Sequence, residues 1–98
     1  MTAISDIAAE RAKQLTKWTP EHDSGQRSGQ LAAAAACYAL SDVVFASVSM
    51  RGRIANIMRE LWPWELVWWK PKDRRANLVT AGALIVAEIE RIDRLKAV

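Results

Sequence analysis

The residues best suited to chemistry in this chain lie between Trp62 and Arg75, where aromatic and basic side chains follow one another closely. This segment holds four of the five tryptophans and two of the three prolines, and it ends in a basic run. Indole rings stack on planar groups such as nucleobases, and guanidinium and ammonium groups bind phosphates. We therefore expect a ligand- or partner-binding surface built from these residues: Trp64, Trp68, Trp69, Lys70, Lys72, Arg74, Arg75, Arg51 and Arg53.

The same tryptophans have a second interpretation, as a lid over the ends of the helices. In that case Trp62, Trp64 and Trp68 pack on the core, and the prolines fix the loop that carries them. Adjacent Trp68 and Trp69 cannot both face one core from a regular element, so at least one is expected to be exposed or at an interface. The residue types alone do not distinguish a lid from a pocket, and both interpretations stay open.

Positive charge is concentrated in this half of the chain. From Arg51 to Arg75, seven Lys and Arg residues stand against three acids, a net charge of +4 within an overall formal charge of +3. A total of this size does not by itself indicate a nucleic-acid-binding protein. Its placement does give the Trp-rich segment a positive field.

The acidic residues and the single histidine form only incomplete catalytic sets. Glu21-His22-Asp23 is an acid–histidine cluster, but adjacent residues rarely converge on one metal ion, so a structural role is expected. Glu90 and Asp93 have the spacing of the magnesium-binding pairs in helical nucleotide pyrophosphohydrolases of the MazG type, although the partner pair is missing. We therefore expect no catalytic residue, no metal and no cofactor, with a degenerate enzyme of that type as the alternative.

The elements that must position these residues are expected to be helices. Alanine is abundant while glycine and proline are few, which favours an all-α chain. The expected order is a helix from Ser5 or Asp6 to about residue 17, a polar loop over 21–28, an Ala-rich helix from about 29 to 48, a break at Gly52, and a short helix that Pro63 ends.

The last helix is expected to start near Pro71 and Asp73 and to bury one apolar stripe. The stripe comprises Leu78, Ala81 or Gly82, Ile85, Ile89, Ile92, and Leu95 or Lys96. The lone Cys37 is expected to be a small core residue. The prediction for the whole chain is a single domain over residues 1–98, a small bundle of three to four helices with a Trp/Pro-rich capping loop.

A chain of 98 residues buries a marginal core, so a homo-oligomer is expected. The N-terminus lacks the apolar centre of a signal peptide, and no stretch is long and apolar enough to span a membrane. A cytoplasmic location in a host cell, with no membrane partner, follows as an expectation.

Three blocks of sequence stand out together: Trp18–Asp23 (WTPEHD), residues 34–39 (AAACYA), and the region from Trp62 to Arg91 (WPW…WWKPKDRR…AGALIVAEIER). They resemble a family of short proteins encoded by tailed phages and prophages of proteobacteria. In that family the loop after the first block continues with further Asp and His and then Gly-Glu-Leu. Here the same places hold Ser24, Gln26, Ser28 and Gln30, which removes possible ligands. Residues 41–61 lie outside the resemblance.

The resemblance implies a phage-derived accessory protein, and the incomplete catalytic sets favour binding without enzymatic activity. Short phage proteins of this kind often disarm host defences. Two mechanisms fit the residues. One is occlusion of a host defence protein or complex, as by an anti-CRISPR protein, through the basic Trp/Arg face. The other is sequestration of a phosphorylated or cyclic nucleotide signal in a Trp/Arg pocket at a subunit interface.

Overall fold

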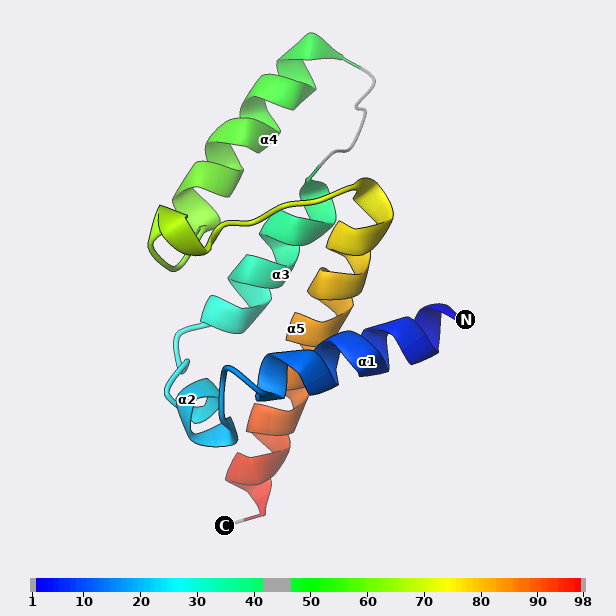
Figure 1. Cartoon of the computed structure of the whole chain (residues 1–98). Coiled ribbons are helices and arrows are strands. Elements are labelled where there is room, and N and C mark those ends of the chain that lie inside the picture. The colour runs from blue at the N-terminus through cyan, green and yellow to red at the C-terminus, as the bar shows by residue number, and fades with distance from the viewer. Residues whose placement is uncertain (1, 42–46, 98) are drawn as a thin grey trace.

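The computed structural model describes residues 2–41 and 47–97, and within them every regular element is a helix. The elements are α1 (Ala3–Leu15), α2 (Pro20–Ser24), α3 (Gln30–Leu40), α4 (Val48–Leu61), the 3₁₀ turn η1 (Leu66–Trp68) and α5 (Arg74–Lys96). The predicted all-α bundle is confirmed (Figure 1), with five α-helices in the described ranges rather than three or four.

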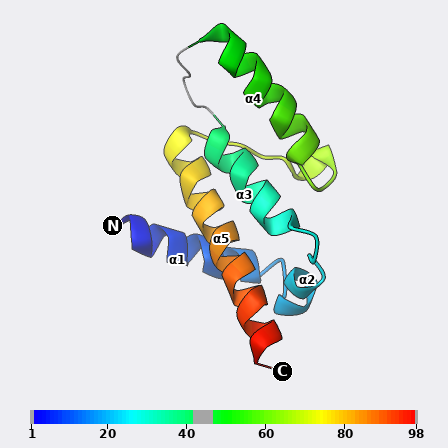
Figure 2. The same cartoon turned by 180° about the vertical axis from the view of Figure 1, so that it is seen from behind.

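The centre of the fold is the antiparallel pair α3 and α5. α1 crosses α5, and α2 lies near the C-terminal half of α5. α4 packs on the side of α3 that faces away from α5 (Figure 1, Figure 2). The small core between α3 and α5 consists of Leu31, Ala34, Ala35, Tyr38, Ala81, Leu84 and Ala87. Because alanine presents a thin surface, the two helix backbones can approach closely. The Ala-rich segment is therefore a helix-packing surface, as expected, and Cys37 is buried beside it.

The first two helices begin at side-chain caps. α1 starts one turn earlier than predicted, because Thr2 and Ser5 form a reciprocal capping box in place of a cap at Ser5 or Asp6. α2 (Pro20–Ser24) occupies part of the predicted polar loop, so that prediction is wrong over residues 21–24. The cause is Thr19, whose hydroxyl caps a helix that Pro20 opens at its first position.

The boundaries between α3 and α4 also differ from the prediction. α3 ends at Leu40 because Ser41 is extended, so the continuous helix to residue 48 is wrong; residues 42–46 lie outside the described ranges. Ser47 caps α4, and Gly52 lies inside this helix rather than at a break. A glycine costs a helix only about 1 kcal/mol, which the cap and the amphipathic sequence offset here. α4 ends before Pro63, as predicted.

α5 begins as predicted but buries a different face. Asp73 caps it by accepting the backbone N–H of Ala76 at 2.9 Å. The predicted core stripe is wrong except at Ala81, since its large members are 39–63% exposed: Leu78, Ile85, Ile89, Ile92 and Leu95. The α5 residues of the core against α3 are Ala81, Leu84 and Ala87, because the alanine surfaces of α3 and α5 pack closely, and no described element covers the isoleucines.

Candidate functional site

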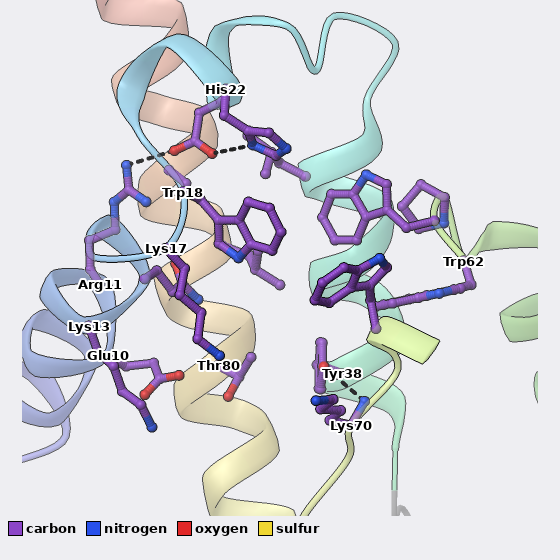
Figure 3. Close-up of a pocket in the computed structure, with 18 of the residues that line it drawn as sticks. Glu10, Arg11, Lys13, Lys17, Trp18, His22, Tyr38, Trp62, Lys70 and Thr80 are labelled. Atoms are coloured by element: carbon purple, nitrogen blue, oxygen red, sulfur yellow. Dashed lines mark hydrogen bonds and ion pairs between the residues drawn. The ribbon is translucent and has the colours of Figure 1, made fainter. Parts of the chain in front are cut away.

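A large cleft opens between α1 and the Trp-rich segment that follows α4. We call it the aromatic cleft; its volume is about 850 Å³, a size typical of small-molecule sites. Its floor comes from α3 and α5, through Leu31, Tyr38, Thr80 and Leu84. Figure 3 shows Trp18 and Lys17 entering it from the α1 side, with Trp62 bordering the other side and Lys70 close to Tyr38.

One wall of the aromatic cleft is a packed group of aromatic rings. Trp62 lies edge-on to Trp64 and Trp69, with ring centroids 5.4 and 4.9 Å apart, and Trp69 lies 4.8 Å from Tyr38. The indole N–H of Trp64 donates to the side-chain oxygen of Gln26 at 3.0 Å. These contacts hold the wall rigidly against the core, so stacking surface is available without ordering a loose loop.

The opposite wall is built around Trp18. Its ring lies 4.6 Å from the imidazole of His22 and meets Trp68 edge-on at 5.4 Å, so Trp18 joins the two sides of the aromatic cleft. Behind it Arg11, which is buried, donates to Asp23 at 3.0 Å and to Glu90 at 2.7 Å. This ion-pair network ties α1 to α2 and α5, and so fixes the wall.

The aromatic cleft is positively charged. Four lysines and Arg11 line it against three carboxylates, a net charge of +2. The lysines are Lys13, Lys17, Lys70 and Lys72. In the described ranges none of them forms an ion pair, so their ammonium groups can bind an anion.

Two backbone anchors hold the lysines of the Trp-rich segment in place. The backbone N–H of Lys70 donates to the hydroxyl of Tyr38 at 3.3 Å. Burial raises the pKa of that hydroxyl, and the hydrogen bond from Lys70 lowers it by a smaller amount. The buried side chain of Asn77 binds both backbone groups of Lys72, accepting its N–H at 2.6 Å and donating to its carbonyl at 3.0 Å.

The nine predicted site residues do not all meet in one place. Trp64, Trp68, Lys70 and Lys72 line the aromatic cleft. Trp69 packs against the core instead, while Trp68 is 47% exposed, so the expectation that the two neighbours face differently is confirmed.

The four predicted arginines lie elsewhere. Arg74 donates to the backbone carbonyls of Ala39 and Ser41 at the end of α3, with 3.1 Å to Ser41. Arg75 forms a 2.7 Å ion pair with Asp6. Arg51 and Arg53 are exposed on α4 and do not line the aromatic cleft. None of the four predicted arginines therefore lines the cleft, whose basic side chains are four lysines and the ion-paired Arg11.

Sequence reasoning missed the α1 side of the site. Trp18, Lys13 and Lys17 come from a part of the chain that carries no net positive excess. Their signal was the spacing of Lys13 and Lys17, four residues apart on one helical face next to the remaining tryptophan.

The acidic candidates are engaged in structural contacts. Glu88 pairs with Arg91, and Glu90 pairs with Arg11, so neither forms a carboxylate pair with Asp93. Across residues 2–41 and 47–97, no three side chains of His, Cys, Asp or Glu gather as metal ligands would. His22 is half exposed beside Asp23, with 3.7 Å between nitrogen and oxygen.

No protein-family model, curated protein or solved structure matches this chain. None of the helices in the described ranges has the length and apolarity to cross a membrane.

Proposed function

We propose that this chain is a non-enzymatic binding protein that holds a phosphorylated planar ligand, of the nucleotide class, in the aromatic cleft. The observation that carries this proposal is the meeting of indole rings and unpaired lysines around one cavity. Indoles bind the face of a base, whereas ammonium groups bind its phosphates. Taken with the resemblance to phage proteins, such binding would sequester a nucleotide signal of a host defence system.

Occlusion of a host protein through the basic Trp/Arg face has less support. That mechanism needs Arg74 and Arg75 to be available to a partner. The Arg74 guanidinium is held by carbonyls at the end of α3, and that of Arg75 is held by Asp6.

The first test is to look for the ligand directly. Native mass spectrometry of the gently purified protein should find extra mass of nucleotide size, and a panel of linear and cyclic nucleotides should contain members that raise the melting temperature. A panel without any thermal shift, together with a bare mass, would contradict the proposal.

The second test removes one positive charge. Lys17→Gln should weaken nucleotide binding about tenfold, because one charge-assisted contact contributes about 1.4 kcal/mol. Lys96→Gln is the matched control, since Lys96 is exposed at the far end of α5 and does not line the aromatic cleft. Titration calorimetry measures both affinities. Equal affinities for the two variants would place the ligand outside the aromatic cleft.

A further inference from the structure

α4 is an amphipathic helix whose apolar side is only half covered. Met50, Ile54, Ile57 and Leu61 recur at steps of four, three and four residues, so they form one stripe. None of them is buried, and Met50, Ile57 and Leu61 are 46%, 45% and 37% exposed. α3 packs against α4, and the N-terminal part of α4 extends past the end of α3 (Figure 1, Figure 2).

We propose that this stripe packs against the same stripe of a second copy of this chain, with the two α4 helices antiparallel. The spacing is that of a two-helix seam, in which apolar residues alternate at three and four positions. About a two-fold axis, Met50 of each copy lies opposite Leu61 of the other, and Ile54 lies opposite Ile57. The seam is about 16 Å long at 1.5 Å per residue.

Charge complementarity supports the antiparallel order. Helical periodicity places Arg53 and Glu60 together on the flank of the stripe that faces away from Met58, and both are exposed. In the antiparallel pair, Arg53 of each copy lies beside Glu60 of the other, which gives two reciprocal ion pairs. In a parallel pair, Arg53 would lie beside Met58 of the second copy and neither ion pair would form.

The surface area of the chain also fits a second copy. Its accessible surface is 6663 Å². A monomer of this mass is expected to expose about 5,600 Å². The excess, roughly 1,000 Å², is close to the ~800 Å² that each partner buries in a stable interface. Burying apolar area of this kind is what holds two copies together.

The test is the mass of the protein in solution by sedimentation velocity over a range of concentrations. The unmodified protein should reach twice the chain mass of 10.9 kDa. Ile57→Glu should stay a monomer, while Ile89→Glu should still dimerise. Ile89 is the matched control because it is an isoleucine of similar exposure, 52%, on α5. A monomeric unmodified protein, or dimers lost through Ile89→Glu and kept in Ile57→Glu, would overturn the proposal.

A charge exchange tests the orientation independently of apolar packing. Glu60→Arg should raise the dissociation constant of the dimer about tenfold, because two attractive pairs become repulsive. The double variant Arg53→Glu, Glu60→Arg should recover the original affinity, since it rebuilds both pairs in reverse. Circular dichroism verifies that each variant keeps its helix content. A double variant as weak as Glu60→Arg alone would refute the antiparallel order.

Discussion

Arg74 and Arg75 are adjacent in the sequence and differ in what they do. The Arg74 guanidinium satisfies the free carbonyls of Ala39 and Ser41 where α3 ends, and a cation is favoured at a helix C-terminus. The ion pair of Arg75 with Asp6 lies at the surface, with the Arg75 side chain 63% exposed, and such pairs contribute little. Arg74→Ala should therefore lower the free energy of unfolding by about 2 kcal/mol and Arg75→Ala by less than about 1 kcal/mol. Urea unfolding measures both, and equal losses would contradict this assignment.

Two buried groups make stability depend on alkaline pH. Burial raises the pKa of the Cys37 thiol above its ordinary 9.0 and that of the Tyr38 hydroxyl above 10.0. The folded chain therefore keeps these protons after the unfolded chain has lost them. This contribution to stability is complete below about pH 9 and decreases as pH rises through the folded pKa values.

The expected result is a free energy of unfolding that falls as the pH rises above about 9, as measured by urea titration. Cys37→Ala should make the fall smaller, because it removes one of the two groups. The comparison uses the change with pH in each protein, so a cavity left by the missing sulfur does not affect it. An identical fall in both proteins would show that the thiol does not contribute.

At the residue scale, the Trp-rich side of the aromatic cleft was predicted from the sequence and the α1 side was not. Clustering of residue types was enough to single out Trp64, Trp68 and Lys70, because neighbours in sequence share one loop. It could not find Trp18, since that ring reaches the site only through the packing of α1 on α5. It also could not foresee that Arg74 would be held by the end of α3, a contact between residues more than thirty positions apart.

At the element scale, Gly52 inside α4 and Gly29 at the start of α3 should respond oppositely to substitution by alanine. Gly52 lies inside α4, with nothing near the position of an added methyl group. Gly52→Ala should stabilise the protein by about 0.5–1 kcal/mol, since alanine has the higher helix propensity. Gly29 has φ +79° where α3 begins, so Gly29→Ala should destabilise it by about 1–2 kcal/mol. Thermal unfolding measures both, and shifts of the same sign would contradict these assignments.

Apart from α2, the helices were predictable, but the face that α5 buries was not. The alanine run, Pro63 and Asp73 indicated α3, the end of α4 and the start of α5, whereas the end of α3 and the start of α4 were wrong. On α5, the large residues Ile85 and Ile89 marked an apolar stripe by periodicity. The face buried against α3 instead follows Ala81, Leu84 and Ala87, because small side chains let neighbouring helices come close. Periodicity identifies an apolar face, whereas burial also depends on which other element lies against it.

At the scale of the whole molecule, the position of α4 makes the chain extended. The Cα radius of gyration is 14.2 Å, and the extents are 47 × 33 × 24 Å. A chain of about 100 residues folded into one compact body has a radius of about 13 Å. The difference arises because α4 packs only along one flank of α3 (Figure 1).

This shape should persist when the chain is a monomer. The Ile57→Glu variant places a charge on the apolar stripe of α4, and so it should neither pair with a second copy nor fold back over α5. Small-angle X-ray scattering should then give an elongated particle whose longest dimension matches the long extent of 47 Å. A rounder particle with a radius of gyration near that of a compact chain would show that α4 closes onto the bundle. One contact that ties α4 to α3 is the Cys37 thiol, which donates to the carbonyl of Met58 at 3.6 Å. Because this contact does not involve Ile57, the charge should leave the angle between α3 and α4 unchanged.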